Sequence, residues 1–177
     1  VSLLPGVTPG IHYAHSEYYL RAMRIDKLSL AALESTLRIC LDRARAFSEI
    51  PTLRMLKATA AELEAPAKRL TDTIRTALDE HGLSKMATVC TLQEASKTGG
   101  GSLPLCDLPT WCAAVALETG DVDDLEAHLA SRTEPPVIAR ISHDQVLFDV
   151  RTILDEKDFA TIAHGIVVYL EELKAHE

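Results

Sequence analysis

The fold of this chain is decided by a late stretch that reads Pro136-Val-Ile-Ala-Arg140-Ile, then Ser142-His-Asp144, then Gln145-Val-Leu-Phe-Asp149-Val. Two runs rich in apolar and β-branched residues around a short polar turn predict an antiparallel hairpin. Two earlier runs, Met86–Leu92 and Trp111–Leu117, are strand candidates by the same criteria. The sequence therefore predicts a small, mostly antiparallel sheet in the second half of the chain.

Helical patterns occupy the chain before these strands. Leu28–Asp42 repeats apolar residues at helical spacing, with Ser29 as the expected N-cap. Thr59-Ala-Ala-Glu62 is a capping box that opens a long helix ending before Gly82. Pro66 lies inside that helix and is expected to kink it or restart it. The apolar stripe of the first helix consists of Leu30, Leu33, Leu37, Cys40 and Leu41.

Two further helices are predicted, Asp121–Ser131 with acids in its first turn and Asp155–Lys174 at the end. Helices followed by a small antiparallel sheet packed with helices define an α+β fold. We expect three parts: an irregular segment over residues 1–18, a helical connector over 19–58, and an α+β domain over 59–177.

Composition narrows the class of protein. The chain has 177 residues and a net charge of −8, which argues against a general nucleic-acid surface or an anionic-membrane binder. No apolar run reaches the roughly 20 residues of a membrane-spanning helix. The four cysteines form no C-x-x-C pair and complete no metal-ligand set, so we expect reduced thiols, no metal site and a cytoplasmic location. The first residue is Val1 rather than Met, which suggests an excerpt or a processed product.

Two arginines near the first helix are candidate anion ligands. In Arg21-Ala-Met-Arg24-Ile-Asp26-Lys27, the guanidiniums are three residues apart and can share one face of a helix or tight turn. Such a fork suits a tetrahedral oxyanion such as phosphate. The alternative is a pair of solvated charges, one of them neutralised by Asp26.

A glycine-rich segment, Thr98-Gly99-Gly100-Gly101-Ser102-Leu-Pro104, follows the first predicted strand. Consecutive glycines leave backbone N–H groups open and allow a ligand or a neighbouring chain to approach closely. The segment is no nucleotide fingerprint, because no Lys-Ser/Thr follows it and no helical pattern begins there. The alternative is a flexible connection between two strands.

Taken together, these motifs resemble bacterial selenocysteine synthase, the L-seryl-tRNA(Sec) selenium transferase family. The resemblance covers roughly residues 19–155 and rests on the arginine stretch with the helix that follows it, on the glycine-rich segment, and on the late hairpin from Pro135 through Arg151. It implies the carboxy-terminal portion of a pyridoxal-phosphate (PLP) enzyme, with a fold like the small C-terminal domain of fold-type I PLP enzymes.

The resemblance also assigns roles to residues. The family enzyme converts seryl-tRNA(Sec) to selenocysteinyl-tRNA(Sec), taking selenium from selenophosphate. Arg21 and Arg24 match family arginines that hold this anionic donor, and at least two fixed cations suit a multiply charged oxyanion. Gly99, Gly100, Gly101 and Ser102 match the family's active-site loop. In many relatives of this fold an arginine near Arg140 or Arg151 binds a free carboxylate; seryl-tRNA has none, so we expect these two to be structural.

A PLP enzyme needs a lysine for the Schiff base. The start of the chain, Ser2-Leu-Leu-Pro5, is similar to the family segment that carries this lysine, but it places Ser2 at the lysine position, and serine forms no Schiff base. By the same resemblance, we expect the cofactor domain to be missing from this chain as well. We therefore expect no catalytic residue in this chain, no PLP bound by it alone, and no activity in isolation.

Two other functions stay open. One is a related PLP-dependent lyase acting on a small amino acid or amino sugar, which a substrate carboxylate on Arg140 or Arg151 would favour. The other is a non-catalytic remnant or interaction module that kept the fold. A truncated piece should expose apolar surface where the cofactor domain or a partner subunit docks, so we expect a homo-oligomer.

Overall fold

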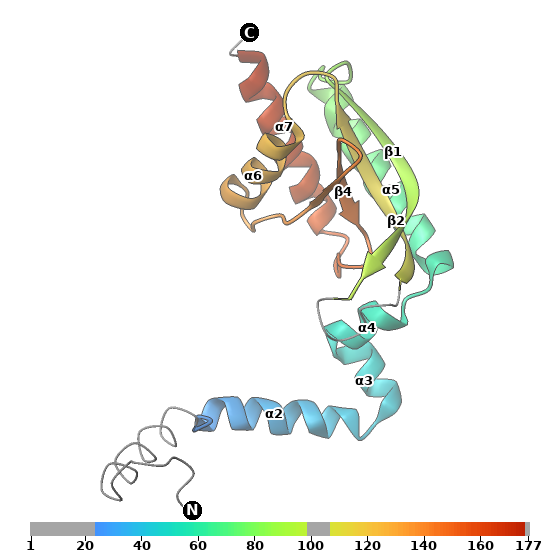
Figure 1. Ribbon diagram of the computed structural model, residues 1–177, viewed down its shortest axis with the longest axis vertical. Coiled ribbons are helices and arrows are strands. Elements are labelled where there is room, and N and C mark those ends of the chain that lie inside the picture. Colours follow the sequence, from blue (N-terminus) through green and yellow to red (C-terminus); the bar gives the residue numbers. More distant parts are fainter. Residues whose placement is uncertain (1–23, 99–106, 176–177) are drawn as a thin grey trace, which may run out of the picture. The chain divides into compact units, whose positions relative to one another are not determined.

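The computed structural model describes residues 24–98 and 107–175, which form six helices and a four-stranded antiparallel sheet (Figure 1). The predicted α+β class is confirmed. The chain divides into two compact units, Val1–Ile50 and Pro51–Glu177. The three-part division expected from the sequence stays a prediction.

The described part of the first unit consists of α2 (Lys27–Cys40) and α3 (Arg43–Glu49). The expected cap of α2 was wrong: Asp26 is the N-cap, and its Oδ1 accepts from the backbone N–H groups of Leu28 and Ser29 at 2.8 and 3.0 Å. Ser29 instead donates its hydroxyl to Asp26 Oδ2 at 2.5 Å. A carboxylate at this position also complements the helix dipole, which favours aspartate over serine.

None of the residues of α2 is buried. The predicted apolar stripe is present, but its leucines are about half exposed or more: Leu33 49%, Leu30 52%, Leu37 56% and Leu41 87%. An isolated helix of this length is marginal in water, and most helices gain their stability by packing an apolar face. Within the described residues, α2 therefore carries an apolar face without a covering layer.

The second unit begins with α4 (Pro51–Lys57) and α5 (Ala60–Glu80). The capping box is confirmed: Thr59 N donates to the Glu62 carboxylate at 2.8 Å, and Glu62 N donates to Thr59 Oγ1 at 3.4 Å. Pro66 does not restart the helix, because α5 continues without a break. Gly82 follows the helix with a φ of +65°, the left-handed conformation that glycine adopts without steric cost.

The sheet has the order β1-β2-β4-β3, with every neighbouring pair antiparallel. β1 (Ala87–Lys97) and β2 (Asp107–Leu117) pair along their whole length, from Ala87 with Leu117 to Lys97 with Asp107. Both strands extend further toward their shared connection than the sequence predicted. The helix α6 (Val122–Arg132) follows β2.

The hairpin of β3 (Arg140–Ser142) and β4 (Gln145–Asp149) is confirmed. Its turn residues His143 and Asp144 both have positive φ, 52° and 56°, as a two-residue hairpin turn requires. β3 begins at Arg140 rather than at Pro136. The chain ends in α7 (Asp158–Ala175), close to the predicted span.

The main core lies between one face of the sheet and the helices α5, α6 and α7. Alternate strand residues such as Val89, Val115 and Phe148 pack there with Leu70, Ile74, Leu125 and Ile166. The opposite face carries a smaller cluster of Cys112, Ala114 and Leu147, with Cys90 and Leu92 beside it. Among the described helices, none combines the length and the apolar character needed to cross a bilayer.

Candidate functional site

Arg24 is exposed and lies just before the N-cap of α2. It makes no hydrogen bond or ion pair with another residue that the structure describes. Asp26, which could have neutralised Arg24, instead accepts hydrogen bonds at the N-terminus of α2. The hydrogen bond from the Ser29 hydroxyl is the main cause that lowers the pKa of Asp26. Among the described residues, the guanidinium of Arg24 is therefore unpaired. Arg21 lies outside the described residues.

The glycine-rich residues Gly99, Gly100, Gly101 and Ser102 also lie outside the described residues. The strands on either side of them are described, and the antiparallel pair Lys97 with Asp107 makes residues 98–106 the connection of a hairpin. The two strands that the sequence predicted on either side of the segment are therefore confirmed as a pair. Its role in an active site stays a prediction.

The hairpin curls at the end that carries this connection. Ser96 of β1 donates to Asp149 Oδ2 of β4, although β2 lies between these strands in the sheet order. Arg140 of β3 reaches still further and donates from Nη1 to the carbonyl of Ala95 at 3.0 Å. In a flat sheet, strands two positions apart are separated by roughly 10 Å, so these contacts require a strongly twisted hairpin.

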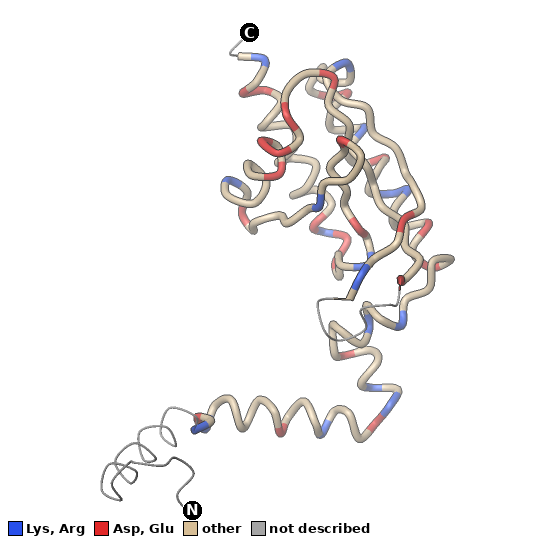
Figure 2. The backbone as a smooth tube through the Cα atoms, in the orientation of Figure 1, with Lys and Arg blue, Asp and Glu red and all other residues tan. Residues whose placement is uncertain are grey.

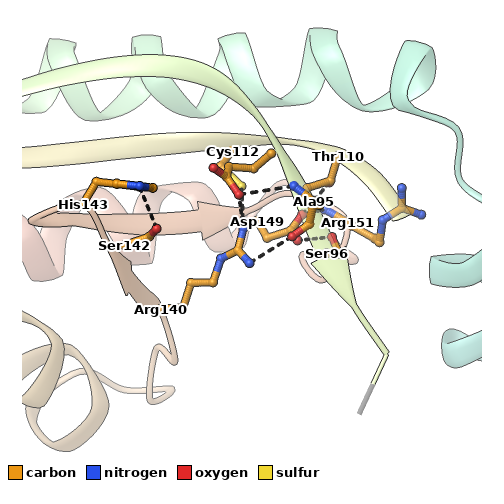
Figure 3. A network of polar contacts seen from close by, with 10 residues as sticks. Ala95, Ser96, Thr110, Cys112, Arg140, Ser142, His143, Asp149 and Arg151 are labelled. Carbon is orange, nitrogen blue, oxygen red and sulfur yellow. Dashed lines mark hydrogen bonds and ion pairs between the residues drawn. The ribbon is translucent and has the colours of Figure 1, made fainter. Parts of the chain in front are cut away.

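The contacts at the curled end form a polar network (Figure 3). Asp149 is its centre: Oδ1 accepts from Thr110 Oγ1 at 2.7 Å and from the backbone N–H of Arg151 at 3.0 Å, and Oδ2 accepts from Ser96. Ser96 and Thr110 are both buried. One carboxylate therefore holds the strand that leads into residues 98–106 and the strand that leads out of them.

Arg151 is 5% exposed, and the acceptors of its guanidinium are backbone carbonyls. Nη1 donates to the carbonyls of Met55 and Ala58, and Nη2 donates to that of Pro109, each at 2.7 Å. No ion pair joins Arg151 to another described residue, and its buried Nε has no hydrogen-bond partner among them. This set of contacts is consistent with the structural role expected from the sequence.

Arg140 is partly exposed and has a mixed set of partners. Besides Ala95, its Nη2 lies 3.4 Å from Glu94 Oε2 and 4.0 Å from Cys112 Sγ. Glu94 and Arg140 are 31% and 39% exposed at their side chains, so the pair is screened by water and contributes little to stability. Its geometric effect is to hold the end of β1 against β3.

The network was not anticipated from the sequence, although one signal was available. Asp149 and Arg151 are two residues apart at the end of a predicted strand, and charged residues there need partners when the strand is buried. What the sequence could not show was that Ser96 and Thr110 come from strands that curl toward them.

The described residues do not fit a PLP site in this chain alone. A Schiff-base lysine is desolvated in a cleft, whereas every lysine of the chain lies among the described residues and is exposed. No group of three or more His, Cys, Asp or Glu side chains among the described residues is arranged to hold a metal ion. Figure 2 shows Lys and Arg interspersed with Asp and Glu along the described chain.

Comparison with known proteins supports the resemblance. The family model of L-seryl-tRNA selenium transferase matches residues 8–154. L-seryl-tRNA(Sec) selenium transferase of Geotalea uraniireducens is 47% identical over 146 residues, covering 81% of this chain and 30% of the relative. The same enzymes of Nitratidesulfovibrio vulgaris and Geobacter sulfurreducens are 44% and 42% identical over 146 and 144 residues, covering 82% and 81% of this chain and 30% of each relative.

The match covers residues 8–154, from before α2 to just past β4. It therefore includes most of the α+β fold and is not limited to one motif. The chain belongs to the L-seryl-tRNA(Sec) selenium transferase family. It spans about 30% of the length of the curated relatives it matches.

Cys112 gives a test of the network. Burial, with a smaller contribution from the charge of Asp149, raises the pKa of its thiol to about 11. At pH 8 only about one thiol in a thousand would be ionised, and the thiolate is the reactive form. We expect iodoacetamide to label exposed Cys40 readily and Cys112 only after unfolding, as read by peptide mass spectrometry. Labelling of both at equal rates in the folded chain would contradict this arrangement.

Proposed function

We propose that this chain is the carboxy-terminal part of a PLP-dependent selenium transferase that converts seryl-tRNA(Sec) to selenocysteinyl-tRNA(Sec), and that it is inactive as an isolated chain. The observation that carries the proposal is the family match over residues 8–154, with 42–47% identity to three transferases. Seryl-tRNA(Sec) and selenophosphate are the corresponding substrates, PLP is the cofactor of the complete enzyme, and the location is cytoplasmic.

Within this proposal Arg21 and Arg24 bind the selenophosphate anion. The support from the described residues is that Arg24 is exposed and makes no bond to another of them, while the nearest acid, Asp26, caps α2. Fixed cations stabilise a multiply charged oxyanion most when they need not first leave another partner. Gly99, Gly100, Gly101 and Ser102 serve the active site of the complete enzyme.

The two alternatives are less favoured. A lyase that binds a free carboxylate would use Arg140 or Arg151, but Arg151 donates to carbonyls of Met55, Ala58 and Pro109, and Arg140 donates to Ala95 and Glu94. A non-catalytic remnant is compatible with the exposed lysines. The tests below separate these functions.

The first test concerns the anion. We expect inorganic phosphate, as a stable substitute for selenophosphate, to shift the Nε–H resonance of Arg24 in a saturable way in a ¹⁵N NMR titration. Arg24→Gln should weaken binding about tenfold, because it removes a charge-assisted hydrogen bond. The matched control is Arg38→Gln in α2, whose guanidinium already pairs with Glu34 at 2.8 Å. Equal losses in the two variants would reject a specific site at Arg24.

The second test concerns the cofactor. We expect the isolated chain mixed with PLP to show no absorbance band that survives borohydride reduction and gel filtration, because its lysines are exposed and none occupies the family's Schiff-base position. Surface lysines react only weakly and without selectivity. A stoichiometric, borohydride-fixed chromophore on one lysine would show that the chain forms its own PLP site.

The third test concerns assembly. We propose a homo-oligomer in which the apolar stripe of α2 is covered, since its leucines are 49–87% exposed in the single chain. Leu33→Glu should shift the chain toward monomer in sedimentation velocity at micromolar concentration. Ser35→Glu is the matched control on the other side of α2, because two residues turn a helix by about 200°. A wild-type chain that stays monomeric throughout would refute the proposal.

A further inference from the structure

Arg151 joins two parts of the second unit that are far apart in sequence. Its Nη1 donates to Met55 and Ala58 at the end of α4, and its Nη2 donates to Pro109 in β2, each at 2.7 Å. A buried guanidinium usually pairs with a carboxylate, which neutralises its charge. Here the acceptors are carbonyl oxygens fixed in the backbone, so the side chain holds two backbone segments at a set spacing.

Asp149 completes this arrangement from the same strand end. It accepts from Ser96 on the strand that enters residues 98–106 and from Thr110 on the strand that leaves them. It also accepts the backbone N–H of Arg151 at 3.0 Å, which fixes the start of that side chain. Hydrogen bonds to an ionised acceptor are shorter and stronger than neutral ones, so both strands are held firmly.

The helix α4 combines these polar contacts with three half-buried apolar residues, Leu53, Met55 and Leu56. None of its residues is buried. Apart from Arg151, a long-range hydrogen bond comes from Arg54, whose Nη2 donates to the carbonyl of Leu154. Guanidinium groups that donate to backbone carbonyls therefore help to fix the position of α4 on the second unit.

We propose that Arg151, oriented by Asp149, is a positioning residue that locks both strands flanking residues 98–106 to the end of α4. The inference deepens the proposed function, in which Gly99–Ser102 serve the active site of the complete enzyme. The main core is built from apolar residues on the other face of the sheet. The polar lock adds a fixed geometry at the one end of the hairpin where that core does not reach.

The test is hydrogen exchange of the full 177-residue chain, resolved by residue, in Arg151→Ala. We expect exchange to speed up about tenfold at residues 94–97 and 107–110 and at Ala58. Amides of Val115 and Val146, fully buried in the core, should change little. The matched control is Arg75→Ala, which removes another guanidinium that donates to a β1 carbonyl, that of Val89, at 3.0 and 2.6 Å.

Chemical rescue separates positioning from general stabilisation. Ethylguanidinium at millimolar concentration should occupy the space left by Arg151→Ala and slow exchange again at residues 107–110 and Ala58. It should have no such effect on Arg75→Ala, whose side chain is half exposed. A uniform acceleration that includes Val115 and Val146, or no acceleration at the flanking strands, would overturn the proposal.

A second variant keeps the test decisive if Arg151→Ala fails to fold. The double change Ser96→Ala with Thr110→Val removes two donors to Asp149 and leaves Arg151 in place. Faster exchange confined to residues 94–97 and 107–110 supports the lock, and unchanged exchange there overturns it. Because these readouts are local, they do not depend on PLP or anion binding, so either the lock or the proposed function can fail without the other.

Discussion

The buried guanidinium of Arg151 is the constraint on which the sheet end of this structure depends. Withdrawing a charge from water is costly unless every strong donor finds an acceptor. Three carbonyls, of Met55, Ala58 and Pro109, accept from its two Nη groups at 2.7 Å each, whereas its buried Nε finds no partner among the described residues. The chain must therefore bring the end of α4, the second strand of the long hairpin and the end of β4 to one point, and the local fold has little freedom to do otherwise.

The two units differ in how far they bury their apolar side chains. The second unit buries its leucines, valines and isoleucines between the sheet and three helices. The described part of the first unit has one buried residue, Ala46, and leaves the stripe of α2 open. The relatives are about three times as long as this chain, since it covers 30% of them.

The sequence predicted the elements better than the contacts. Periodicity and turn chemistry located the hairpin of β3 and β4, and the Thr59–Glu62 capping box located the start of α5, because both signals are local. The cap of α2 was assigned to Ser29 instead of Asp26, since both residues are good caps and only geometry separates them. The network around Asp149 could not be predicted, because it depends on the twist that brings Ser96 across β2. Arg21 and the glycine segment rest on resemblance alone.

β1 is an edge strand of eleven residues, a length that commonly invites pairing with another chain. The register with β2 turns the carbonyls of Val89 and Ala95 toward the free edge. Arg75 donates hydrogen bonds to the carbonyl of Val89, and Arg140 donates one to that of Ala95. A strand from another molecule would have to displace both guanidiniums before it could add to the sheet. Arg75 and Arg140 thus also obstruct this edge against the intermolecular β-pairing that starts aggregation.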